Sequence, residues 1–492
     1  MKKKPFSSSE YQAEDWVSLW KPGSDKKKLI KLLQKAALAL DKADKNQAEK
    51  ALLEFVGAHQ YFPVSKTDGA PLAYGTNIKD FFNGELNRVV ERFSRTVVSE
   101  AKAAEKKVLI SKLFCLIGKY QDADRWAENA VKTDPDLAEG HLQLAKTSRI
   151  YSLPEKTIEC LRKAVDLTSD RADYFYLLGD FLQVCNLDQE AVEAFNEALV
   201  RRPDYSKALY GLCWSLRRLG RVEEAVHAGE KAVQLAPNSH TFFHLIYALL
   251  AAGKNDAAIK RCHEALELNP MDPAAFAFLS TALYETGQYE EGRSICDFEN
   301  LLKVMNISPP PGYSSLASFN QSLVEVALAS PTRIMDPTQT NNLFLSSSGP
   351  FYDFKDTINR VVKMYYDSFP SNFSHPFLSQ KMENWQIDGW ATRLKKMDEQ
   401  EHHFHNHAWL SGVYYAKLPG GIGRGGTEEG CIEFCRFRPY SASCSESEVE
   451  LATIRPEEGL VVLFPSYFYH RILPFNDNDY RISIAFNFIP EF

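Results

Sequence analysis

Residues 174–203, YFYLLGDFLQVCNLDQEAVEAFNEALVRRP, carry the pattern that decides the first part of the fold. Apolar residues recur at helical spacing on both sides of Asn186, and Pro203 closes the stretch. The residue before a proline is disfavoured in the helical region, so the second helix is expected to end just before Pro203. The stretch therefore predicts two antiparallel helices joined by a short turn at Asn186.

The same arrangement recurs along the chain. Turn-forming residues return at intervals of 34, 34, 34, 33 and 34 positions, at Gly118, Ser152, Asn186, Gly220, Gly253 and Gly287. Each of the first five turns is followed at a constant interval by an alanine, at Ala130, Ala164, Ala198, Ala232 and Ala265. A helix-ending residue follows each alanine, at Pro135, Ser169, Pro203, Pro237 and Pro270. Small alanines let paired helices approach closely, so residues 103–307 are predicted to form a helical solenoid.

This pattern resembles the tetratricopeptide repeat. In the last repeat, Glu299 stands where the late alanine is expected, as in a capping repeat. The resemblance implies stacked helical hairpins whose groove binds a protein or peptide. Residues 1–102 are also predicted to be helical, around 27–57 and 76–107, but they do not hold the repeat register and form either degenerate repeats or a separate cap.

The sequence Ser308-Pro-Pro-Pro-Gly312 interrupts the helical pattern, because consecutive prolines cannot continue a helix. We expect a domain boundary there and a second domain over residues 313–492. Helical periodicity reappears at 354–366, and strands are predicted at 409–418, 450–454, 460–465 and 481–489. Short strands with Gly, Pro, Asn and Asp between them favour a β-sandwich or double-stranded β-helix, also called a jelly roll. The fold class is thus an all-α solenoid followed by a jelly roll.

Composition narrows the class of protein. The net charge is −7 at pH 7, which argues against a nucleic-acid-binding protein. The nine cysteines show no paired spacing, as expected for reduced thiols in the cytoplasm. No apolar run approaches the length of a membrane-spanning helix, and no secretory leader is evident. We therefore expect a cytoplasmic protein that neither spans a membrane nor is secreted.

Histidines gather ahead of the strand predicted at 409–418. His403, His405 and His407 alternate, and residues two apart on a strand point the same way. Imidazole is a good ligand for Fe, Zn, Cu and Ni, so two neighbours of this set can bind one metal ion. His470 follows at a distance, and Arg481 and Ser483 stand beyond it on the last predicted strand. An arginine with a nearby hydroxyl can hold the far carboxylate of a small dicarboxylate bound to the metal.

These residues, in this order, resemble the 2OG-Fe(II) oxygenase family that is often fused to tetratricopeptide repeats. The matching segments are Trp385 to Trp390, His403-Phe-His405, Trp409-Leu-Ser-Gly-Val-Tyr-Tyr415, Pro456-Glu-Glu-Gly459, Leu463 to His470 and Arg481-Ile-Ser-Ile-Ala-Phe486. The resemblance implies Fe(II) held by His403, His405 and His470. It implies 2-oxoglutarate anchored by Arg481 and Ser483, with Tyr415 also in reach. The implied reaction couples oxidative decarboxylation of 2-oxoglutarate to hydroxylation of a protein or peptide presented by the repeats.

One position departs from the family pattern. The usual iron site has two histidines and a carboxylate, and His405 occupies the place of that carboxylate. The third position is then a histidine, water, or a carboxylate from Asp398, Glu399, Glu401, Asp477 or Asp479. Two alternatives stay open: an inactive repeat scaffold with an oxygenase-like binding domain, and a three-histidine dioxygenase that does not use 2-oxoglutarate. The glycine-rich segment 421–426 is interpreted as a loop, and as a candidate active-site lid, because no helix follows it.

Overall fold

The computed structural model describes residues 31–32, 35–40, 42, 44–58, 87–95, 103–151, 153–332, 336, 338–380, 382–398, 400–422, 428–435 and 451–491. The described chain falls into two compact units, the first ending at Leu235 and the second beginning at Ala236. Of the predicted lid at 421–426, residues 423–426 lie outside the described residues.

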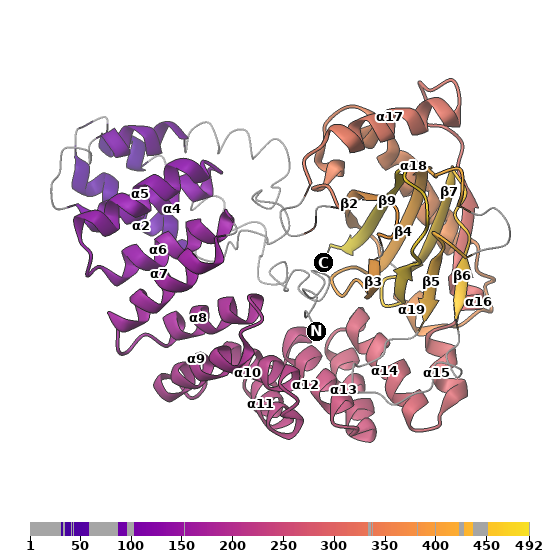
Figure 1. Cartoon of the computed structure of the whole chain (residues 1–492), viewed down its shortest axis with the longest axis horizontal. Coiled ribbons are helices and arrows are strands. Elements are labelled where there is room, and N and C mark those ends of the chain that lie inside the picture. The colour runs from indigo at the N-terminus through magenta and orange to yellow at the C-terminus, as the bar shows by residue number, and fades with distance from the viewer. Residues whose placement is uncertain are drawn as a thin grey trace. The chain divides into compact units, whose positions relative to one another are not determined.

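Six helical hairpins follow one another in the described residues (Figure 1). Their helices are α4 (Ala104–Leu116) with α5 (Tyr120–Thr133), α6 (Ala138–Ile150) with α7 (Pro154–Asp166), α8 (Ala172–Val184) with α9 (Asp188–Arg201), α10 (Ser206–Arg218) with α11 (Val222–Leu235), α12 (Ser239–Ala251) with α13 (Asn255–Leu268), and α14 (Pro273–Glu285) with α15 (Tyr289–Ile295). The five alanines of the repeat are all buried between helices. The repeated-hairpin prediction is confirmed.

The five turn residues of the repeat that the structure describes adopt a left-handed backbone. The φ angle is positive at Gly118, Asn186, Gly220, Gly253 and Gly287. Glycine and asparagine tolerate this conformation, which explains why the turns accept so few residue types. The last hairpin is cut short: α15 has only seven residues, and Glu299 lies in the next short helix, α16 (Phe298–Leu301).

The aromatic ring of Phe195 on α9 is wedged between glycines of two neighbouring helices. A Cβ atom added at Gly211 of α10 would lie 2.5 Å from Cζ of Phe195, and one at Gly179 of α8 would lie 2.7 Å from its Cε1. We expect Gly211→Ala to lower the free energy of unfolding of this unit by about 1–3 kcal/mol, because the fully buried ring has no room to move. Thermal denaturation followed by circular dichroism measures this change.

Gly140→Ala on α6 is the matched control. There the added Cβ would meet Val131 Cγ2 at 3.5 Å, an ordinary contact. Alanine also favours the helix over glycine by about 0.5–1 kcal/mol, so this variant should be at least as stable as the wild-type protein. A Gly211→Ala protein as stable as Gly140→Ala would contradict the packing argument.

The first hundred residues are helical where the structure describes them. Helix α2 spans Lys45–Ala58, and residues 35–40 and 87–95 are also helical. Phe55 and Phe93 are buried in one apolar cluster that also contains Leu113 of α4. Among the described residues, no helix is both long and apolar enough to cross a membrane.

The second unit contains two antiparallel sheets of the expected sandwich. The strands are β1 (Lys303–Asn306), β2 (Trp385–Leu394), β3 (Gln400–His403), β4 (Leu410–Lys417), β5 (Ile432–Cys435), β6 (Ala452–Ile454), β7 (Leu460–Pro465), β8 (Tyr469–Ile472) and β9 (Arg481–Pro490). One sheet has the order β1-β7-β4-β9-β2 and the other β3-β8-β5-β6. All their pairings are antiparallel, so the jelly-roll fold class is confirmed. β1 precedes the three prolines yet pairs with β7.

Helices α17 (Leu316–Ala329) and α18 (Pro350–Asp367) cover one face of the five-stranded sheet. Tyr414 on β4 points to this face, where its hydroxyl donates to Asn320 Oδ1 and its ring lies 4.9 Å from that of Phe354. Tyr415 points the opposite way, into the space between the sheets. Only the second tyrosine therefore faces the candidate site.

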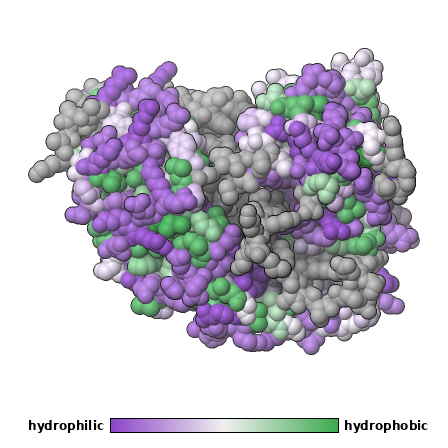
Figure 2. Space-filling model, viewed as in Figure 1, coloured by the Kyte–Doolittle hydropathy of each residue, from purple (hydrophilic) through white to green (hydrophobic). Residues whose placement is uncertain are grey.

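In Figure 2, hydrophobic residues on the visible face form separate small patches among hydrophilic ones.

Candidate metal centre

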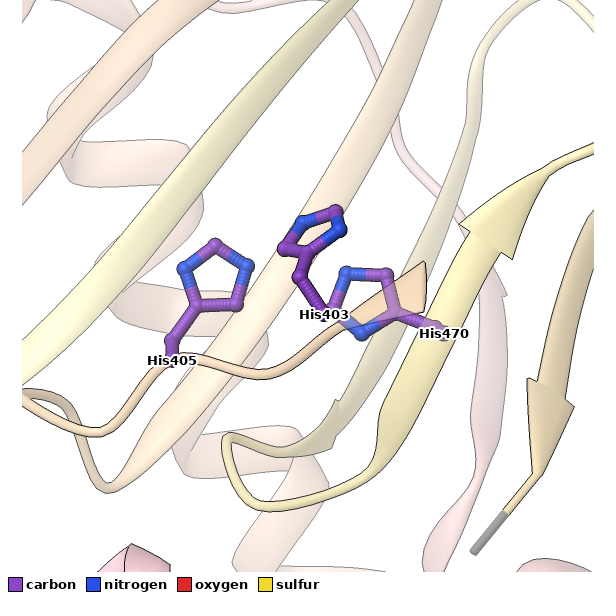
Figure 3. Close-up of side chains that lie close together, drawn as sticks. All are labelled: His403, His405 and His470. Carbon is purple, nitrogen blue, oxygen red and sulfur yellow. The ribbon is translucent and has the colours of Figure 1, made fainter. Parts of the chain in front are cut away.

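Three histidines converge between the two sheets (Figure 3). His403 ends β3, His405 lies two residues later, and His470 stands on β8 directly opposite His403 in the strand register. Their ring centroids lie 4.4 Å (His403 to His470), 5.2 Å (His403 to His405) and 5.3 Å (His405 to His470) apart. One ring nitrogen from each histidine lies within 4.8 Å of the other two. The structure thus brings together the three histidines singled out in the sequence.

Hydrogen bonds at Nδ1 leave the other ring nitrogen of His403 and His470 available. Nδ1 of His403 lies 2.8 Å from the carbonyl oxygen of Glu401, and Nδ1 of His470 lies 2.8 Å from that of Phe468. A carbonyl oxygen only accepts, so both Nδ1 atoms carry the hydrogen and both Nε2 atoms keep a lone pair. Such outer contacts orient imidazoles that bind metals.

Burial keeps the imidazoles of His403 and His470 neutral. It lowers the pKa of His470 well below its usual value and also lowers the pKa of His403. The side chains of His405 and His470 are only 4% and 5% exposed. A neutral imidazole binds a cation without first losing a proton, so His403 and His470 are ready to bind a divalent metal ion at pH 7.

Asn487 is a candidate functional residue that the sequence reasoning missed. It lies on β9 and lines the same cavity as the three histidines. Its Nδ2 atom lies 3.1 Å from Nδ1 of His405, and its Oδ1 atom accepts from Ser411 Oγ at 2.7 Å. The signal for it was present: Arg481, Ser483, Ala485 and Asn487 alternate along one strand and so share its inner face.

For His405 to bind a metal through Nε2, its Nδ1 must donate a hydrogen bond. Rotating the Asn487 amide by half a turn places its oxygen there, since the Ser411 hydroxyl can accept from the NH2 group instead. We expect Asn487→Ala to weaken metal binding about 10- to 100-fold by releasing His405. Asn487→Asp keeps an acceptor oxygen and should retain most of the affinity. Calorimetric titration with Co(II) distinguishes the two; equal affinities for Asn487→Ala and the wild-type protein would refute this role.

Arg481 lies further along the inner face of β9 and is fully buried. Its Nη1 donates to Ser483 Oγ at 3.1 Å and its Nε donates to the carbonyl oxygen of Gly430 at 3.2 Å. Tyr415, opposite Ser483 on β4, places its ring 5.1 Å from Cζ of Arg481. Within the described chain, neither Arg481 Nη2 nor Tyr415 Oη makes a hydrogen bond of ordinary geometry, although the two side chains are close enough to shift each other's pKa. No carboxylate of the described chain pairs with the guanidinium.

A buried cation without a counter-ion is costly, so the surroundings of Arg481, called here the Arg481 end, suit an anion. Burial lowers the pKa of Arg481 and raises that of Tyr415 to about 12, which leaves the arginine cationic and the phenol protonated at pH 7. A charged guanidinium and a neutral hydroxyl together are donors for a carboxylate.

Residues 388–487 match the family model described as "Putative 2OG-Fe(II) oxygenase". This segment begins on β2, ends at Asn487 and contains every residue of the cluster and of the Arg481 end. We call it the oxygenase-family segment. In the same chain, residues 189–240 and 249–297 match two tetratricopeptide repeat models.

Relatives and solved structures resemble the chain only in part. The TPR repeat-containing protein YpiA of Bacillus subtilis is 26% identical over 33% of this chain and 39% of its own length. Tetratricopeptide repeat protein 7B of Homo sapiens is 30% identical over 28% of this chain and 16% of its own length. The crystal structure of YrrB, a TPR protein, matches with 16% identity and a TM-score of 0.34 over 38% of this chain and 96% of YrrB. The chain thus spans less than half the length of these two curated relatives.

No carboxylate joins the histidines within the described part of the oxygenase-family segment. The side chain of Asp398 accepts from the backbone of Lys395, and Glu401 is exposed. Asp477 accepts from the backbone of Gly421, and Asp479 pairs with Lys417. The remaining candidate, Glu399, lies outside the described residues.

Proposed function

We propose that the chain is an Fe(II)- and 2-oxoglutarate-dependent dioxygenase that hydroxylates a protein or peptide. The observation that carries the proposal is a three-histidine cluster in a cavity lined by the inner face of β9, the strand that also carries Arg481. Arg481 is buried and has no carboxylate partner among the described residues. His403, His405 and His470 would hold the iron, and Arg481 with Ser483 and Tyr415 would hold the far carboxylate of 2-oxoglutarate. The match of residues 388–487 to the oxygenase family supports this assignment.

The residues present fit both groups. Bound Fe(II) with 2-oxoglutarate and O2 would supply the oxidising chemistry. The chain would supply orientation: outer contacts fix two of the imidazoles, and the arginine fixes one end of the co-substrate. Trp390, Val413, Ile432 and Phe464 line the cavity and give it apolar walls. With three protein ligands, positions on the iron stay open for the co-substrate and O2.

The helical repeats would present the substrate. Stacked helical hairpins commonly bind extended polypeptides, which is why a protein or peptide is the proposed substrate class. The last two hairpins, α12 with α13 and α14 with α15, belong to the same compact unit as the three-histidine cluster. A cytoplasmic location would suit the described cysteines, none of which forms a disulfide.

The test is a decarboxylation assay on the full chain. We expect Fe(II) to bind in a one-to-one ratio and 2-oxoglutarate to be converted to succinate and CO2 only when iron and O2 are present. A folded, iron-loaded protein that produces no succinate, with or without peptides as substrate, would favour an inactive scaffold instead.

One observation favours a second candidate, a three-histidine dioxygenase that does not use 2-oxoglutarate. The described cluster contains three histidines and no carboxylate. This candidate gives Arg481 no role, so O2 consumption that is independent of 2-oxoglutarate and unaffected by replacing Arg481 would support it.

A further inference from the structure

Phe404 lies between two of the proposed ligands and makes contacts on the other face of the strand. Because alternate residues of an extended segment point to opposite sides, His403 and His405 face the cavity while Phe404 faces outward. There its ring meets that of Phe278 on α14 at a centroid distance of 6.1 Å and an angle of 82°, an edge-to-face contact. A residue of the helical repeats therefore contacts the ligand-bearing segment itself.

Phe278 is held firmly. Its side chain is fully buried, and its ring lies 5.3 Å from Phe243 and 5.7 Å from Tyr247, both on α12. Phe404 also lies 6.4 Å from Tyr469, the neighbour of His470. The outward ring of the ligand segment thus contacts Phe278 of α14 and Tyr469 of β8, the strand that carries the third histidine.

Phe276, a second residue of α14, contacts the segment that follows His405 and the segment that precedes His470. The ring of Phe276 stacks on Tyr467 at 5.2 Å and meets Trp409 at 5.7 Å. Tyr467 precedes His470 and donates from its hydroxyl to the carbonyl oxygen of Ile295 on α15 at 2.8 Å. Backbone bonds join the two segments: the amide of His405 donates to Ser466, and the amide of Ser466 donates to Trp409.

We propose that the last helical hairpin is a structural part of the metal centre, and that Phe278 and Phe404 are positioning residues for it. This rests on the proposed function, since it takes the three histidines as the ligands. Phe278 acts through Phe404 and touches neither metal nor co-substrate. Its ring fixes the path of residues 403–405, on which the direction of two imidazoles depends.

The test is a double-mutant cycle on the full chain with Phe278→Leu and Phe404→Leu, measuring Co(II) affinity by calorimetry and the visible absorption of bound Co(II). Each single variant should weaken Co(II) binding about tenfold and alter the spectrum, as expected for loss of an orienting contact. The double variant should bind no more weakly than either single one, because both changes remove one contact. Phe404→Tyr keeps the ring at a half-buried position and should restore wild-type affinity.

Phe195→Leu is the matched control, a fully buried phenylalanine on α9 in the other unit. It should lower the melting temperature without changing Co(II) affinity. Losses that add in the double variant, or single variants that bind Co(II) as the wild-type protein does, would overturn the proposal. If Phe278→Leu does not fold, the contrast between Phe404→Leu and Phe404→Tyr decides. A wild-type protein that binds no Co(II) would refute the metal site itself, and a Co(II)-binding protein without turnover would refute only the activity.

Discussion

Replacing His470 by alanine is expected to lower Fe(II) affinity and 2-oxoglutarate turnover each by more than about 100-fold. Replacing a residue that hydrogen-bonds to a metal ligand typically lowers metal affinity or activity about 10- to 100-fold. Removing a ligand itself should lower them further. His470 lies opposite His403 in the β3–β8 pair and is only 5% exposed. Because the position is buried, we do not expect a side chain from the protein surface to replace the missing imidazole as a ligand. Calorimetry with Fe(II) under anaerobic conditions and release of labelled CO2 from 2-oxoglutarate measure the two effects.

The control for this variant is His402→Ala. His402 adjoins His403 in sequence but stacks on Tyr469 at 5.2 Å and lies outside the three-histidine group. If truncating a histidine in the β3–β8 pair lowered Fe(II) affinity only by destabilising the fold, both variants should bind Fe(II) more weakly. If His470 is a ligand, only His470→Ala should bind Fe(II) more weakly. Undiminished Fe(II) binding by His470→Ala would remove the histidine cluster as the iron site.

The sequence predicts the helical repeats well because each hairpin is a local structure. The turn at Asn186, the buried alanine at Ala198 and the helix end before Pro203 all lie within one repeat, and the next repeat copies them. By contrast, β1 was not predicted. It is four residues long, it lies before the prolines, and its strand character comes from pairing with β7, far along the chain.

The candidate site divides in the same way. Alternation along a strand is local, so the shared direction of His403 and His405 was visible in the sequence. The register that places His470 opposite His403 depends on the long-range pairing of β3 with β8. The sequence shows that His470 follows the first histidines along the chain, but it does not show where His470 lies in space. The contact between Phe278 and Phe404 joins the two predicted domains, and neither domain's pattern contains a signal for it.

Replacing Arg481 by methionine is expected to raise the KM for 2-oxoglutarate about 100- to 4,000-fold while leaving Fe(II) affinity unchanged. The buried carboxylate of the co-substrate would lose its charged partner, a change that typically costs about 3–5 kcal/mol, and each 1.4 kcal/mol is a factor of ten. Methionine has a similar shape, so it should fill the space beside Tyr415. In the unliganded protein it also removes a buried cation without a counter-ion among the described residues, and the melting temperature should stay the same or rise.

Arg393→Met on the neighbouring strand β2 is the matched control. Its guanidinium donates to the carbonyl oxygens of Ala327 and Leu328, on the face of the sheet opposite to Arg481. This variant should leave the KM for 2-oxoglutarate unchanged and gain no stability. An Arg481→Met protein with unchanged turnover would favour the three-histidine dioxygenase that does not use 2-oxoglutarate. If Arg481→Met instead raises the melting temperature and also raises the KM for 2-oxoglutarate, Arg481 serves co-substrate binding and not stability. This follows because a buried charge without a counter-ion contributes nothing to the stability of the fold.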